Sequence, residues 1–119
     1  LIWNIGSGYF GCRDENGRFS EEAFVRNACL PQVKMIEIKL SQGAKPGHGG
    51  ILPAPKVTPE IAEARGVAPW QDCNSPSSHS AFDSPIGLLK FLARLRELSE
   101  GKPVGFKFCV GHPWEWFAI

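Results

Sequence analysis

Apolar residues recur along this chain at two spacings, one typical of β-strands and one typical of α-helices. Short apolar or alternating runs predict strands, at Leu1–Ile5, Met35–Leu40 and Val104–Val110. Amphipathic stretches with capping residues predict helices, at Glu21–Cys29, from Pro59 to Arg65, from Pro85 to just before Gly101, and after Pro113. The chain therefore alternates strands with helices over most of its length.

The helix that begins at Pro85 has the clearest signals. Ser84 is a good N-cap and Pro85 suits the first helical position. Leu88, Leu92 and Leu95 form one apolar stripe along the predicted helix. This stripe predicts a helix that packs one face against a sheet.

Alternation of strands and helices predicts parallel strands joined by crossover helices. A doubly wound sheet and a (β/α)₈ barrel both fit. An inner strand of a doubly wound sheet is apolar on both faces, whereas one face here carries Glu37, Lys39 and Lys107. The pattern favours part of a (β/α)₈ TIM barrel, about three consecutive βα units with a long glycine-rich loop. A whole barrel needs about 200 residues or more, so residues 1–119 are expected to be a fragment of one barrel domain.

The most informative segment follows the second predicted strand, at Gln42–Gly50. Its glycines permit positive φ angles and let backbone N–H groups approach an anion. Lys45 adds a positive charge. Apart from the short helix that ends at Arg65, residues 41–83 are predicted to be loop, and a loop of this length is usually functional.

Composition excludes several functions. The chain has 21% charged residues and a net charge of +1, which argues against nucleic-acid binding and membrane-surface binding. No apolar run is long enough for a transmembrane helix. The cysteine spacings match no metal site, so Cys12, Cys29, Cys73 and Cys109 are expected to be free thiols in a reducing, cytoplasmic compartment.

Several motifs together resemble the flavin-binding synthase domain of glutamate synthase. The run from Gln42 to Gly50, followed by Leu52-Pro53, resembles the signature loop of that family. The turn Ser7-Gly8-Tyr9-Phe10-Gly11 resembles its Ser-Gly-Arg-Phe-Gly turn, and Ser75-Pro76-Ser77-Ser78-His79 resembles its Ser-Pro-Pro-Pro-His turn. Their order and spacing hold across nearly the whole chain.

The resemblance implies a (β/α)₈ barrel that binds FMN and reduces 2-iminoglutarate, formed from 2-oxoglutarate and ammonia, to L-glutamate. It implies a 3Fe-4S cluster whose ligands the family places beyond this segment. The implied partners are the 2-oxo acid, the rest of the barrel, and an electron-donating subunit or ferredoxin. The implied site residues are Lys39 and Lys107 as catalytic residues beside FMN, Ser7 and Gly8 at the cofactor, and Gln42, Lys45, Gly47 and Arg65 at the substrate.

The chain departs from the family pattern at one position that bears on substrate choice. Ile51 stands where the family has a glutamine after the Gly-Gly pair. An apolar side chain there predicts poorer use of 2-oxoglutarate and resembles the shorter branch that lacks a glutaminase domain. The alternatives are a related flavin amine or N-methylglutamate synthase subunit, or a non-catalytic fragment that keeps the anion-binding loop.

Overall fold

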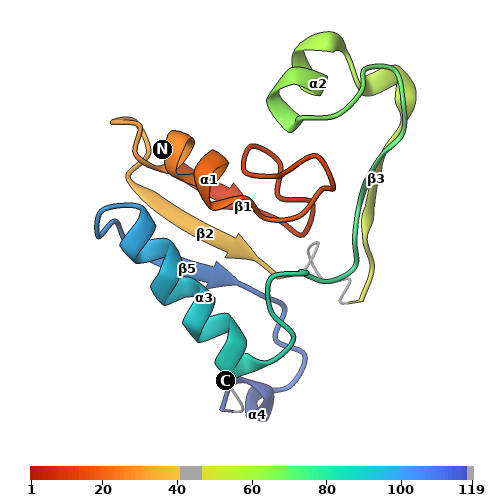
Figure 1. Ribbon diagram of the computed structural model, residues 1–119. Helices are drawn as coiled ribbons and strands as arrows, with labels where there is room; N and C mark the ends of the chain where they lie inside the picture. The colour runs from red at the N-terminus through yellow and green to blue at the C-terminus, as the bar shows by residue number, and fades with distance from the viewer. Residues whose placement is uncertain (41–46, 118–119) are drawn as a thin grey trace.

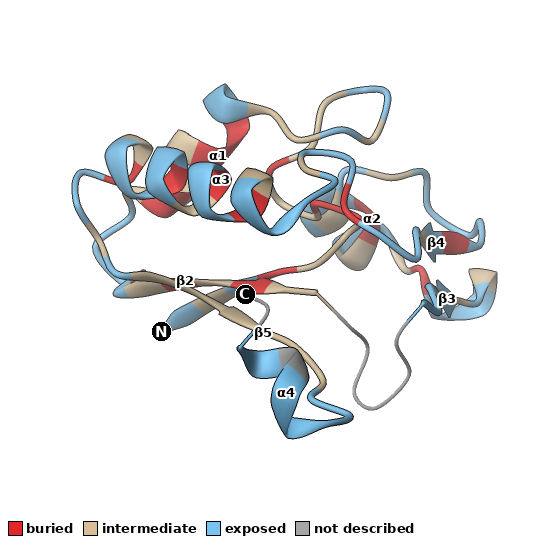
Figure 2. Cartoon of the chain, turned by 90° about the horizontal axis from the view of Figure 1, so that it is seen from below, coloured by how far each residue is buried: buried red, intermediate tan, exposed pale blue. Residues whose placement is uncertain are grey.

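The computed structural model describes residues 1–40 and 47–117 and contains a parallel three-stranded sheet. Its strands are β1 (Ile2–Ile5), β2 (Met35–Lys39) and β5 (Val104–Lys107), in the order β1-β2-β5. Helices α1 (Glu21–Ala28) and α3 (Pro85–Leu98) pack on one face of this sheet (Figures 1 and 2). The predicted alternation of parallel strands and crossover helices is confirmed.

The main core lies between the sheet and these two helices. Ile36 and Ile38 of β2 are fully buried on the helix side, and each such side chain contributes roughly 1.5–3 kcal/mol. They pack with Phe24 of α1 and Leu95 of α3, which are also fully buried. The odd-numbered residues of β2 therefore point to the opposite face of the sheet. Glu37 and Lys39 lie on that face and are half-buried.

Capping serines fix the N-terminal ends of α1 and α3. The hydroxyl of Ser20 accepts a hydrogen bond from the N–H of Ala23 (3.3 Å), and that of Ser84 accepts one from Gly87 (3.1 Å). Arg94 of α3 donates two hydrogen bonds to the Glu21 carboxylate of α1, at 2.8 and 2.7 Å. These hydrogen bonds lower the pKa of Glu21. The two helices are thus linked at their exposed surface as well as through the core.

An arm extends from the sheet between β2 and α3 (Figure 1). It contains an antiparallel pair, β3 (Gly50–Leu52) and β4 (Cys73–Ser75), a 3₁₀ turn (Ala54–Lys56) and helix α2 (Pro59–Arg65). A second, smaller core of Val57, Ala62 and Cys73 holds it together. The prediction of a loop around α2 was therefore wrong for these segments, because three-residue strands far apart in sequence leave no periodic signal.

The last strand is shorter than predicted, whereas the helix after Pro113 is present as expected. Strand β5 ends at Lys107, three residues before the predicted end at Val110, and helix α4 (Pro113–Trp116) follows. Figure 2 shows α4 on the side of the sheet opposite α1 and α3. Its Trp116 stacks on Phe108, with ring centroids 5.6 Å apart. Within the described residues, no helix has the length and apolar character needed to cross a membrane.

Candidate functional site

The carboxyl ends of β2 and β5 bring two lysines together. Lys39 and Lys107 are Cα partners in the parallel register, and their positions place both side chains on the face that α1 and α3 do not cover. Two residues earlier in the register, Glu37 pairs with Gly105 and accepts a hydrogen bond from Asn4 (2.6 Å). This face is therefore polar, with its two cations at the end where the loops begin.

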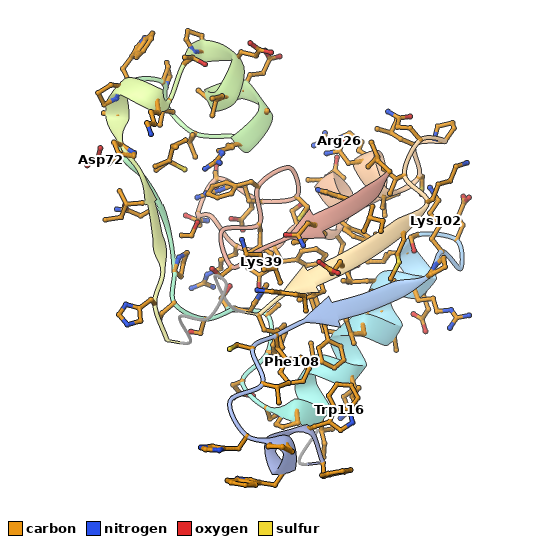
Figure 3. All side chains as sticks on the ribbon, turned by 180° about the vertical axis from the view of Figure 1, so that it is seen from behind. Arg26, Lys39, Asp72, Lys102, Phe108 and Trp116 are labelled. Atoms are coloured by element: carbon orange, nitrogen blue, oxygen red, sulfur yellow. The ribbon has the colours of Figure 1, made fainter. Side chains whose placement is uncertain are left out.

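A cavity of about 350 Å³ opens beside Lys39, between the sheet and the arm. Figure 3 shows Lys39 on the uncovered face of the sheet, on the side toward the arm. Of the residues predicted to form the site, Gly8, Lys39 and Arg65 line this cavity, and so does Ile51. These residues come from the loop after β1, from β2, from α2 and from β3. These four segments, together with β1 and β4, form the wall of this cavity.

Arg65 is fixed in the cavity wall by the aromatic ring of Phe10. Its guanidinium carbon lies 4.7 Å from the ring centroid, a cation–π geometry. Its Nη1 also donates to the Cys73 sulfur at 3.7 Å. Gly66 ends α2 directly after Arg65 in a left-handed conformation (φ 65°). The side chain is thereby held at the junction of arm and sheet, where it can meet a carboxylate.

The turn after β1 supplies the other predicted residues of the site. Ser7 donates a hydrogen bond to the carbonyl of Pro76, and with Lys39 and His48 it lines a small neighbouring cavity. Gly8 is buried, and a Cβ there would lie 2.6 Å from the Phe10 ring. Only glycine therefore leaves the ring that supports Arg65 in place.

Sequence reasoning missed the groups that fix the position of Lys39. His79, only 7% exposed, lies 2.9 Å from the Lys39 carbonyl through Nε2 and 3.0 Å from the Tyr9 hydroxyl through Nδ1. A carbonyl only accepts, so Nε2–H donates to Lys39 and Nδ1 accepts from Tyr9. The Tyr9 oxygen in turn accepts from the N–H of Ala81 (3.1 Å). This series of hydrogen bonds joins the turn that contains Tyr9 and the turn that contains His79 to the end of β2.

Burial lowers the pKa of His79 below its ordinary value of 6.5, although its hydrogen bond to the Lys39 carbonyl opposes the shift. The unfolded chain therefore binds this proton more readily than the folded chain does, so stability falls as pH decreases through 6.5. We expect urea unfolding to show this loss between about pH 7 and 5. His79→Gln keeps one donor and one acceptor but does not titrate, so it should reduce the pH slope. If stability depends on pH equally in the wild type and in His79→Gln, the pH dependence does not come from His79.

Three of the other predicted residues belong to the glycine-rich loop. Gln42 and Lys45 lie outside the described residues. Gly47 is exposed, with φ of 74°, and does not line the cavity beside Lys39. Within residues 1–40 and 47–117, no three His, Cys, Asp or Glu side chains are grouped as a metal site requires. All four cysteines are free, and burial raises the pKa of Cys12 to about 12.

Comparison with known proteins identifies the family of this arrangement. A conserved region in glutamate synthase matches residues 1–119. The glutamate synthase large subunit-like protein YerD of Bacillus subtilis is 43% identical over 115 residues, covering 97% of this chain and 22% of that protein. The archaeal glutamate synthase [NADPH] of Methanocaldococcus jannaschii is 35% identical over 113 residues, covering 94% of this chain and 20% of that protein.

A third relative has the same region within a much longer protein. The ferredoxin-dependent glutamate synthase of Antithamnion sp. is 37% identical over 106 residues, which cover 89% of this chain and 6% of that protein. The chain thus spans about a fifth or less of the length of these curated relatives. The match to the conserved region extends from the first residue to the last, through both turns and the strand that carries Lys39. The chain therefore belongs to the glutamate synthase family.

Proposed function

We propose that this chain is part of an FMN-dependent, glutamate-synthase-like oxidoreductase that reduces 2-iminoglutarate, formed from 2-oxoglutarate and ammonia, to L-glutamate. The observation that carries the proposal is the cavity shared by Lys39, Arg65 and Gly8. It lies at the carboxyl ends of parallel strands, where (β/α)₈ enzymes build their active sites. The three-stranded sheet, with α1 and α3 on one face and polar groups on the other, supports its placement as a section of such a barrel.

The chain's own residues suit a dicarboxylate substrate. Arg65 offers a planar guanidinium, a geometry that matches a carboxylate, and Phe10 and Cys73 restrict its movement. Lys39 supplies a second cation to the same cavity. In this proposal the two cations bind and orient the substrate, and Gln42 and Lys45 of the glycine-rich loop complete its site.

The residues present also fit a flavin. Lys39 and Lys107 place two cations side by side on a polar face, and an added Cβ at Gly6 would meet no atom within 4 Å, so the backbone beside Ser7 is open to a flat ring. FMN, when bound, would supply the hydride, and nearby cations would favour its reduced form. Ser7, Gly8, Lys39 and Lys107 would hold it, and an electron-donating subunit or ferredoxin would supply electrons through a 3Fe-4S cluster bound elsewhere.

One observation favours a different 2-oxo acid or amine, as in a related flavin amine or N-methylglutamate synthase. Ile51 lines the cavity beside Lys39 and is 71% exposed, so its apolar side chain is available to a ligand. An apolar wall leaves a carboxylate oxygen without a donor, and an unmet buried polar group costs about 1–3 kcal/mol. The size of this effect separates the two candidate functions.

The test is steady-state formation of L-glutamate from 2-oxoglutarate and ammonia by the protein at its natural length, with reduced ferredoxin as electron source. We expect glutamate to form, and Ile51→Gln to raise kcat/KM for 2-oxoglutarate about tenfold. Ile86→Gln is the matched control, because Ile86 is 67% exposed on α3 and away from the cavity. Absence of both glutamate formation and a flavin spectrum would refute the proposal. Activity only on 2-oxo acids with apolar tails would favour the alternative.

A further inference from the structure

A second cavity, of about 470 Å³, lies on the other side of Arg65 from the candidate site. Its walls are the last turns of α1 and α2 and the loop after β1. Arg13, Arg26 and Arg65 line it from these three segments, and Glu63 is its one carboxylate among the described residues. Figure 3 shows Arg26 beside α1, well away from Lys39. Positive charge therefore exceeds negative charge in this cavity.

The local packing holds Arg13 in a defined position. Its guanidinium carbon lies 5.5 Å from the centroid of Phe10, the ring that also supports Arg65. Gly17 has φ of 76°, and a Cβ there would come within 2.3 Å of the Arg13 Nη2 atom, so this glycine leaves room for the guanidinium. Two arginines are thus packed around one ring despite their mutual repulsion.

Arg13, Arg26 and Arg65 form no ion pair within 4.0 Å among the residues that the structure describes, although Glu63 lines the same cavity. The ion pairs found in the described part of the chain, within 4.0 Å, join Arg94 to Glu21 and Glu97. The Nε atom of Arg13 is buried and has no hydrogen-bond partner among the described residues, an arrangement that is unfavourable for a polar group. Arg26 and Arg65 lie in the last turns of α1 and α2. A cation there interacts favourably with the helix dipole. That explanation does not apply to Arg13, which lies in a loop.

We propose that this second cavity binds a phosphate group, either free or carried by a small nucleotide. Arginine side chains that line one cavity from three segments offer the donors that the several oxygens of a phosphate accept. Asn27 strengthens the wall, because its side-chain amide donates to the Gly11 carbonyl at 2.6 Å and joins α1 to the loop that holds Arg13. The site is separate from the proposed substrate cavity and shares only Arg65 with it.

The test is a calorimetric titration of the flavin-loaded protein at its natural length with inorganic phosphate and, separately, with AMP, up to about 10 mM. We expect saturable binding of at least one of them. Arg13→Gln and Arg26→Gln should each weaken it about tenfold or more. The matched control is Arg96→Gln, since Arg96 is exposed on α3 and lines neither cavity.

The two ligands distinguish the source of the phosphate group. Tighter binding of phosphate than of AMP would identify a free-phosphate site, and the reverse order would identify a nucleotide site. If Arg13→Gln does not fold, Arg26→Gln alone decides, because Arg26 is exposed and makes no hydrogen bond that the fold needs among the described residues. No binding by the wild type, or binding that Arg26→Gln and Arg96→Gln leave unchanged, would overturn the proposal. Neither result depends on glutamate formation, so this site can fail while the proposed function stands.

Discussion

Lys39→Met is expected to lower kcat/KM for glutamate formation about a hundred- to a thousandfold while leaving the protein folded. The substitution keeps an unbranched side chain of similar length but removes the cation from the cavity wall, next to Arg65 and opposite Lys107 in the register. Removing one preorganised electrostatic contact from an active site has effects of this size. Steady-state kinetics of the protein at its natural length provides the measurement.

Two further variants make this result specific. Lys90→Met is the matched control, because Lys90 is an exposed residue of α3 and should leave the rate unchanged. Lys107→Met should reduce the rate as well, and the double variant should lose less than the product of the two single losses, because neighbouring charges act together. A Lys39→Met protein with wild-type kinetics would remove Lys39 from the proposed site.

The second large effect is expected on stability, from His79→Ala. The substitution removes the donor to the Lys39 carbonyl and the acceptor of the Tyr9 hydroxyl, both in buried surroundings. It also leaves a cavity beside Phe82, whose ring stacks on His79 with centroids 5.0 Å apart. Unmet polar groups and lost packing together predict a loss of about 3 kcal/mol in the free energy of unfolding, measured by urea titration.

Tyr9→Phe distinguishes the hydrogen bonds from the packing. Phenylalanine keeps the ring that packs against Phe19, with centroids 5.8 Å apart, but leaves the N–H of Ala81 without its acceptor. We expect a smaller loss, about 1–2 kcal/mol. His48→Ala serves as control, since His48 is exposed and should change stability little. If His79→Ala costs no more than His48→Ala, the buried hydrogen-bond chain does not stabilise the fold.

The sequence predicted those parts of the fold that depend on local signals. Ser84 as N-cap and Pro85 at the first helical position predicted the start of α3, and α2 extends from Pro59 to Arg65 as expected. The side-chain parity of β2 correctly separated a helix-facing side from a polar side. Such features depend on residues a few positions apart, so one sequence is enough to predict them.

The candidate site was only partly predictable, because its contacts join distant segments. Tyr9 and His79 are 70 positions apart, and His79 and Lys39 are 40 positions apart. No spacing rule predicts that a buried imidazole at one turn supports the carbonyl of a strand. A possible signal was Tyr9 itself, an aromatic residue with φ of 49° in a glycine-rich turn, but backbone angles are not visible in a sequence. The strands of the arm were missed for the same reason.

The separation of the two hydrophobic cores has a consequence for how this family can diversify. Ile51 belongs to the arm, with its own core of Val57, Ala62 and Cys73, whereas Lys39 belongs to the sheet, with its core under α1 and α3. A mutation that reshapes the arm side of the cavity therefore leaves the packing beneath Lys39 unchanged. Under the proposed function, single substitutions on the arm are expected to alter substrate preference without disturbing the sheet that carries Lys39.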